Sequence, residues 1–343
     1  ELTWETSHSF NAGMDFELLG GHLNGSIEYF ARKTQDLLYS KDVPLSSGNP
    51  TGQFPVNVGS ILNSGFEASF DGMILDSRNV QWNWNLNFSH YRNRILSLDG
   101  SIGPEGITGS NYIYKVGGSL YEAYMYRYAG VDQESGKALF YYNATDEEGN
   151  KVLKTTDGFS DADQFECGSV LPKLYGGFGT TLRLYGFDIS AQFSFQLGGR
   201  YYDGTYQALM HTNPSAGYAW HKDVLNSWTP DNRDTSIPRL DGDTSIGQSA
   251  VDCFMISSDY LSINNITVGY TLPSKWMKKA HIQKLRIYFT GENLLTFDKL
   301  RGLPIDPECV TGVSMWGSNY AQGRTGLNTP VFKTVSFGVQ ATF

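Results

Sequence analysis

The chain is dominated by segments in which apolar and polar residues alternate. In the clearest one, apolar residues occupy every odd position from Phe187 to Leu197, while Asp188, Ser190 and Gln192 begin the polar series between them. Successive side chains of a β-strand point to opposite faces of a sheet. A period of two therefore predicts a strand with one apolar and one polar face.

Nine segments follow this pattern. They lie near residues 8–19, 22–34, 60–74, 80–96, 174–185, 187–198, 261–272, 284–295 and 331–343. They are longer than the roughly five or six residues usual for strands in globular proteins. Their lengths are sufficient for the roughly 9–11 residues that a tilted strand needs to cross a bilayer. The fold class that we predict is all-β, a transmembrane antiparallel β-barrel with long extracellular loops.

The connections between these segments alternate between short and long. Short ones lie at 20–21, 75–79, 186 and 273–283, and long ones at 35–59, 97–173, 199–260 and 296–330. Outer-membrane barrels have short periplasmic turns and longer extracellular loops. We therefore expect the short connections on the periplasmic side and the long ones outside the cell.

Composition narrows the function classes. The net charge is −9, so the chain has no basic excess with which to neutralise phosphates, and nucleic acid is not an expected partner. Aromatic residues reach 14%. Trp82 and Trp84 lie beside a short turn and Trp276 lies within another, as in the aromatic girdles of membrane barrels. Packing of these rings in a soluble core is the alternative.

The odd number of predicted strands bears on whether this chain forms a complete barrel. Closed single-chain bacterial barrels have an even number of strands, and an open edge in lipid leaves costly unpaired backbone groups. We expect residues 1–343 to be the C-terminal part of a larger barrel whose earlier strands precede Glu1.

Several stretches, in this order, resemble SusC/RagA-type TonB-dependent outer-membrane transporters. They are Asn57–Glu67, Leu171–Phe178, Ser258–Pro273, Gly291–Phe297 followed by Asp306–Glu308, and the aromatic end Ala341–Phe343. The resemblance spans essentially the whole chain.

This resemblance implies a barrel of 22 strands, of which about nine lie here, closed by an N-terminal plug domain that is absent from this chain. It further implies active import of an oligosaccharide or peptide, energised by TonB through the plug, with a SusD-like lipoprotein capping the barrel. Outer-membrane lipid and the rest of the barrel are the other implied partners. The expected location is the outer membrane of a Gram-negative bacterium.

The sequence offers little for catalysis or metal binding. None of the six histidines belongs to an HExxH or similar ligand pair, and no Gly-x-Ser-x-Gly elbow occurs. The acidic stretches 146–150 and 157–163 lack the EF-hand spacing, and we read them as solvated loops rather than calcium sites. We predict no enzyme activity, no cofactor and no metal.

Aromatic residues in the long loops are the candidates for contact with substrate or partner. They are Tyr112, Tyr114, Tyr121, Tyr124, Trp220, Trp316 and Tyr320. Amphipathic rings suit both sugar stacking and protein interfaces, although large loops also use them for internal packing. The loop 97–173 adds twelve acidic and six basic residues, a net charge of −6. We expect this loop and 199–260 to meet the lipoprotein.

Two other functions remain compatible with the pattern. A passive porin-like channel would have the same strands without a plug. A soluble β-sandwich adhesin would share the alternation but would stay soluble without detergent.

Overall fold

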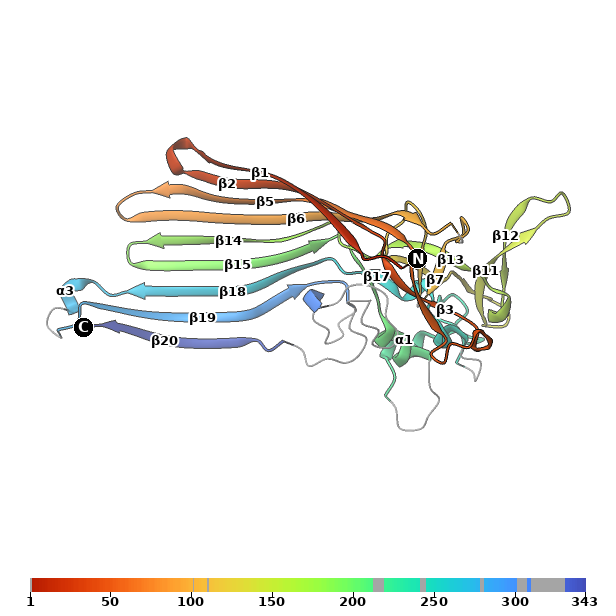
Figure 1. The fold of residues 1–343 in the computed structure, drawn as a ribbon. Coiled ribbons are helices and arrows are strands. Elements are labelled where there is room, and N and C mark those ends of the chain that lie inside the picture. The colour runs from red at the N-terminus through yellow and green to blue at the C-terminus, as the bar shows by residue number, and fades with distance from the viewer. Residues whose placement is uncertain are drawn as a thin grey trace.

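The computed structural model describes residues 2–100, 102–109, 111–211, 219–240, 245–277, 281–300, 307–309 and 331–343. Its main body is one antiparallel sheet of nine strands in the order β1-β2-β5-β6-β14-β15-β18-β19-β20 (Figure 1). Their bounds are β1 Thr6–Leu18, β2 Leu23–Gln35, β5 Gly59–Asp76, β6 Val80–Leu98, β14 Leu174–Leu184, β15 Phe187–Leu197, β18 Tyr260–Thr271, β19 Lys284–Phe297 and β20 Thr334–Thr342. The nine predicted strands are confirmed.

None of the helices in these ranges is long and apolar enough to cross a membrane.

The short connections all lie at one end of the sheet and the long ones at the other (Figure 1). The short end carries η1 (Leu19–Gly21), the β5–β6 and β14–β15 turns and α3 (Ser274–Met277). The β14–β15 turn consists of Tyr185 and Gly186, whose φ angles are 48° and 91°. A two-residue type I′ turn requires positive φ at both positions, so Gly186 suits this turn while Tyr185 adopts an uncommon backbone.

The pairing register gathers the apolar positions of all nine strands on one face. Phe193 of β15 lies opposite Phe178 of β14 and Ile263 of β18. The same face continues toward the two edges through Phe88, Phe66, Tyr29 and Ala12 on one side and through Leu295, Phe289, Phe337 and Val335 on the other. The other face is lined mainly by Asn, Gln, Ser, Thr and carboxylates. Two chemically distinct faces over the whole sheet are the arrangement that lipid on one side and water on the other require.

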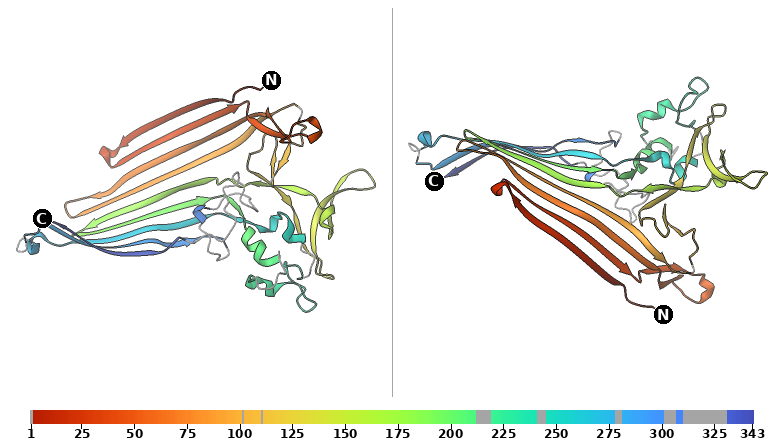
Figure 2. Two further views of the ribbon diagram at one scale, coloured as in Figure 1. Left: turned by 60° about the horizontal axis from the view of Figure 1, so that its bottom comes forward. Right: turned by 90° about the horizontal axis from the view of Figure 1, so that it is seen from above.

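Aromatic contacts between neighbouring strands reinforce the apolar face. The rings of Phe178 and Phe193 stack at 4.6 Å between centroids with an interplanar angle of 10°. Phe70 and Phe88 stack at 6.2 Å. Such cross-strand pairs contribute roughly 0.2–1 kcal/mol each. The sheet that they hold together is curved rather than flat (Figure 2).

An ion pair on the polar face links two strands of the sheet. Asp188 of β15 accepts hydrogen bonds from Arg286 of β19 across the intervening strand β18. Gly269 lies beneath this pair, and a Cβ atom there would come within 2.6 Å of both side chains. The absence of a side chain at Gly269 therefore lets the ion pair span three strands.

The long connections carry their own small sheets and helices at the other end of the molecule (Figures 1 and 2). One sheet contains β13 (Gln164–Ser169), β9 (Glu122–Tyr126), β8 (Tyr112–Tyr114) and β7 (Ile107–Gly109). A second contains β10 (Tyr128–Val131), β11 (Ala138–Thr145) and β12 (Lys151–Thr156). Two further antiparallel pairs are β3 (Leu38–Asp42) with β4 (Gln53–Asn57) and β16 (Arg200–Tyr202) with β17 (Met255–Ser257). The helical segments are η2 (Leu45–Ser47), η3 (Phe159–Asp161), α1 (Gly204–His211), η4 (Lys222–Asn226), α2 (Ser245–Gln248), η5 (Asp252–Phe254) and η7 (Pro307–Cys309).

Because the short connections lie at one end of the sheet, labelling them tests which side of the membrane that end faces. Cysteines introduced at Gly20, Asp76, Gly186 and Ser274 should resist an impermeant maleimide on intact cells, because we assign that end to the periplasm. A cysteine at Glu148, which is exposed in the β11–β12 turn at the opposite end, is the positive control. Ready labelling of the four turn positions from outside would reverse the orientation.

Candidate functional site

Two long connections fold together into one unit at the end of the sheet opposite the short connections. Its buried core joins Ala123, Met125 and Phe140 from the 97–173 connection to Tyr202 and Phe254 from the 199–260 connection. We call the two connections with this shared core the loop unit. Because the core draws on both, neither connection can form it alone.

Ring contacts order this core. Phe140 is fully buried and meets the ring of Phe159 edge-on at 5.1 Å between centroids. Phe159 in turn contacts Tyr126 at 4.3 Å. Tyr202 is also fully buried, and its hydroxyl donates to Gln207 Oε1 at 2.8 Å. Burial of the phenol raises the pKa of Tyr202 well above its usual range.

The structure divides the predicted contact aromatics by burial. Tyr112 is only 2% exposed and packs edge-on against Tyr121 at 6.5 Å, so it belongs to the core. Tyr114 and Tyr121 are partly buried against the same core. Tyr124 is partly exposed, and Trp220 is 43% exposed.

Trp316 and Tyr320 lie outside the described residues. A contact role for any of the seven aromatics stays a prediction, and Trp220 is the one whose side chain is exposed among those that the structure describes.

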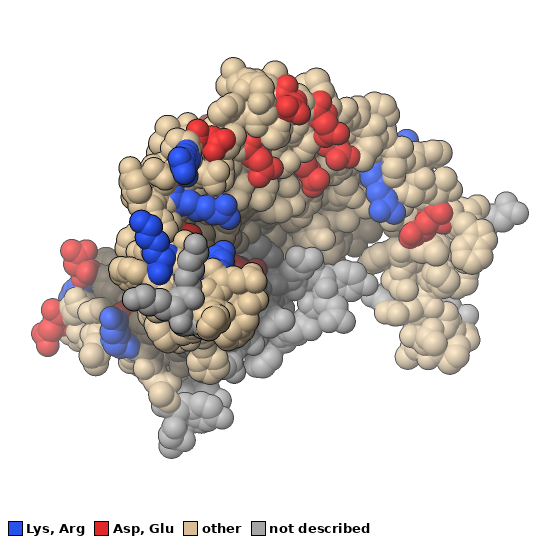
Figure 3. Space-filling view, turned by 90° about the vertical axis from the view of Figure 1, so that its left-hand side faces the viewer, with Lys and Arg blue, Asp and Glu red and all other residues tan. Residues whose placement is uncertain are grey.

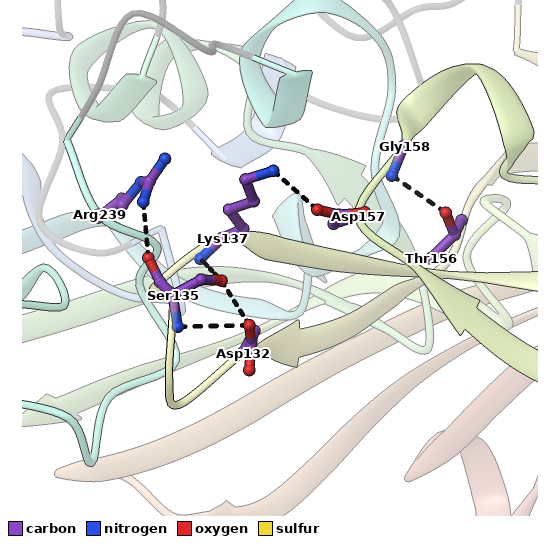
Figure 4. A network of polar contacts seen from close by, with 7 residues as sticks. All are labelled: Asp132, Ser135, Lys137, Thr156, Asp157, Gly158 and Arg239. Atoms are coloured by element: carbon purple, nitrogen blue, oxygen red, sulfur yellow. Dashed lines mark hydrogen bonds and ion pairs between the residues drawn. The ribbon is translucent and has the colours of Figure 1, made fainter.

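One polar contact in Figure 4 joins the two connections of the loop unit, and two more lie within the 97–173 connection. Arg239 donates from Nη1 to the Ser135 carbonyl oxygen at 2.8 Å, and the Ser135 hydroxyl bonds to Asp132. Lys137 Nζ lies 2.8 Å from Asp157 Oδ2. These bonds lower the pKa of Asp132 through the Ser135 hydroxyl and that of Asp157 through Lys137. Because their pKa values are lowered, both carboxylates stay charged at a lower pH than isolated carboxylates do.

The polar face of the large sheet is approached by a segment from the last long connection. Glu308 of η7 accepts hydrogen bonds from Ser194 Oγ at 2.7 Å and Asn264 Nδ2 at 3.0 Å. Asn264 occupies a bulge in β18, where the pairing register shifts between Ile263 and Asn265. The contact places η7 against the polar face of the sheet.

Carboxylates gather on the polar face near β1, β2 and β5. Glu28 and Glu67 are opposite each other in the register, and Asp15, Glu17 and Asp71 line a hollow beside them. Figure 3, seen from the short-connection end, shows acidic side chains gathered in its upper part, where Figure 1 places these strands. Within the described ranges, no group of three or more His, Cys, Asp or Glu side chains is placed to hold a metal ion.

A cavity of about 1220 Å³ lies where the loop unit meets the ends of β6, β14 and β15. Its charged lining has both signs and consists of Arg92, Glu122, Arg127, Glu166, Lys173, Arg200 and Asp252. Burial raises the pKa of Glu122 and of Asp252. Burial also raises the pKa of the Cys167 thiol to about 11, which lowers its thiolate fraction at neutral pH.

The sequence contained a signal for the loop unit that the length of the connections obscured. In residues 122–126, buried Ala123 and Met125 alternate with partly exposed Tyr124 and Tyr126, the same period of two as in the large sheet. The Glu308 contact and the cavity had no comparable signal, because both depend on segments far apart along the chain.

The geometry defines a segment of an outer-membrane β-barrel, and comparison with known proteins identifies its family. Residues 1–294 match the family model described as TonB dependent receptor-like, beta-barrel. The chain belongs to this family, and the family resemblance predicted from the sequence is confirmed. TonB-dependent receptor P3 of Formosa agariphila is 29% identical over 322 residues, covering 90% of this chain and 31% of that protein. TonB-dependent receptor SusC of Bacteroides thetaiotaomicron is 26% identical over 324 residues, covering 91% and 30%.

Solved structures agree with this assignment. The RagAB peptide transporter superposes with a TM-score of 0.78 at 27% identity, over 99% of this chain and 36% of that chain. The RagAB peptide importer in its open-open state gives a TM-score of 0.76 at 26% identity, over 100% of this chain and 35% of that chain. The present chain thus spans about a third of the length of the relatives it matches.

Proposed function

We propose that this chain forms the C-terminal part of the wall of an active outer-membrane importer for oligosaccharides or peptides. In this proposal TonB supplies the energy through a plug domain in another part of the protein. A SusD-like lipoprotein caps the barrel from outside. The chain contributes passage and docking surfaces and no catalysis.

Family membership is the observation that carries the proposal, and the two faces of the sheet agree with it. The apolar face suits lipid, and the polar face suits a water-filled interior that a solute could cross. In the described residues, β1 hydrogen-bonds only to β2 within the large sheet, and β20 only to β19. Further strands on both sides would satisfy these two edges in lipid, as a closed barrel requires.

Deletion of the full gene tests the import function. We expect the mutant to lose growth on one oligosaccharide or peptide mixture as its main nutrient, and the intact gene to restore that growth. Unchanged growth and uptake on every such nutrient would contradict the proposal.

We further propose that the loop unit is the docking surface for the lipoprotein. Trp220 is exposed on it, and Asp146, Glu147 and Glu148 extend the acidic charge at the β11–β12 turn. Exposed aromatic anchors surrounded by charged residues are typical of protein interfaces. Point changes test docking better than a loop deletion, because a deletion that removed Phe140 would also destroy the buried core.

Trp220→Ala should reduce co-purification of the lipoprotein at least about fivefold, because truncation of an aromatic anchor commonly costs more than 1 kcal/mol of binding. The measurement is the ratio of lipoprotein to barrel after affinity purification in detergent. Leu225→Ala, which removes another exposed apolar side chain from the same connection, is the matched control. Equal retention of the lipoprotein by both variants would move the docking surface elsewhere.

A further inference from the structure

The wall formed by β6 and β14 splits before β6 ends. Pairing between the two strands stops at Tyr175 and Ser89, whereas β5 remains paired with β6 as far as Leu98. Further along, Ile95 donates to the Gly118 carbonyl at 2.8 Å and accepts from the Gly117 N–H at 2.9 Å. Between Ser89 and Ile95, a stretch of roughly 20 Å, β6 therefore has a neighbouring strand on one side only.

The backbone of this stretch has groups that point away from β5. Alternate residues of an antiparallel strand direct both N–H and C=O to the same side. Ile95 directs its pair toward Gly117 and Gly118, and the β5–β6 register is continuous from Ile95 to Tyr91. Asn93 and Tyr91 must then direct their backbone groups to that side too.

These groups lack backbone partners among the described residues on the side away from β5. Asn93 is only 5% exposed, and its side-chain Oδ1 accepts from Leu120 N at 2.7 Å. Unpaired backbone donors and acceptors in a sheltered place are costly. A ligand able to pair with them would therefore gain free energy.

The large cavity lies along this edge. Tyr91, Arg92 and Asn93 line it on the β6 side, and residues 171–173 and 198–200 line it on the other. Its charged side chains include both signs. Backbone groups repeating every second residue, about 7 Å apart, match the repeat of an extended polypeptide, and charges of both signs suit peptide termini and side chains better than a neutral sugar.

We infer that the open edge of β6 at Tyr91–Asn93 binds an extended peptide by β-strand addition, with the cavity accommodating its side chains. The occupant is a short free peptide on its way through the importer, so the inference rests on the proposed function and names peptides as a substrate class. Main-chain hydrogen bonds would provide affinity with little dependence on sequence.

The test uses the full-length transporter with its lipoprotein in detergent and a fluorescent hexapeptide of alanine and serine. The same peptide N-methylated at alternate residues cannot donate along one edge. We expect N-methylation to weaken binding at least about tenfold, because two or more main-chain hydrogen bonds are lost. Unlabelled maltohexaose should not compete.

Photocrosslinking locates the bound peptide. The photoreactive residue p-benzoylphenylalanine in place of exposed Arg92 should crosslink the hexapeptide, whereas the same residue in place of Arg183, exposed near the other end of β14, should not. Ser257→Trp, which adds bulk to the cavity lining, should abolish the crosslink, and Ser160→Trp, exposed outside the cavity, should preserve it. Heat-modifiable migration on gels checks that each variant is folded.

Equal binding of the N-methylated peptide, or peptide binding without a crosslink at position 92, would overturn the inference. Import measured in cells separates this result from the proposed function. Intact nutrient uptake with no crosslink at position 92 refutes the strand-edge site alone. Peptide binding at the edge in a protein that imports nothing refutes the proposed function alone.

Discussion

Phe193→Arg should largely prevent assembly of the barrel in the outer membrane. Phe193 lies near the middle of β15 on the apolar face, stacked on Phe178 at 4.6 Å. An arginine facing lipid at the bilayer midplane costs about 2–4 kcal/mol, and the change also removes the ring contact. The measurement is the amount of folded, heat-modifiable protein in outer-membrane fractions, for which we expect a severalfold loss.

Gln192→Arg is the matched control, because Gln192 is the preceding residue and lies exposed on the polar face. A charge there meets water, and we expect near-normal assembly. If the two variants assembled equally well, the assignment of the faces to lipid and water would be wrong.

Phe140→Ala should unfold the loop unit while the strands below it stay assembled. Phe140 is fully buried and contacts the rings of Tyr128 and Phe159. Truncation of a buried Phe to Ala commonly costs about 3–5 kcal/mol, which is a large share of the stability of a small folded unit. Limited proteolysis of intact cells should therefore cleave within 97–173 at far lower protease concentration than in the parent protein.

Leu153→Ala controls for loss of an apolar side chain in the same small sheet, because Leu153 is 47% exposed in β12. We expect its proteolysis to match that of the parent protein. Resistance of Phe140→Ala, or loss of the whole barrel, would show that the loop unit does not fold as a separate cooperative body.

The large sheet was predictable because each strand contains its own evidence. In Phe187–Leu197, alternation alone predicts the strand, its faces and the short turn before it, and the observed bounds differ from the predicted ones by one residue. The predicted strand ends were less accurate where the alternation of polar and apolar residues is irregular. We predicted 331–343 for the last strand, which the structure confines to Thr334–Thr342.

The loop unit was not predictable in the same way, because its stability comes from contacts between distant segments. Phe254 packs against a core that includes Phe140, more than a hundred residues earlier in the chain. Tyr112 illustrates the consequence. Its sequence context suited a surface anchor, whereas the fold buries it against Tyr121. The break in pairing beyond Ser89 likewise depends on where β14 begins in space.

The energy source of uptake tests the central claim most directly. In cells that express the full-length protein, the initial rate of uptake of a radiolabelled nutrient, identified by the deletion mutant, should be measured with TonB present, with TonB deleted, and after a protonophore. An active importer predicts that both treatments reduce uptake to the level of the deletion mutant. Uptake that persisted unchanged in both would contradict the account and identify a passive channel.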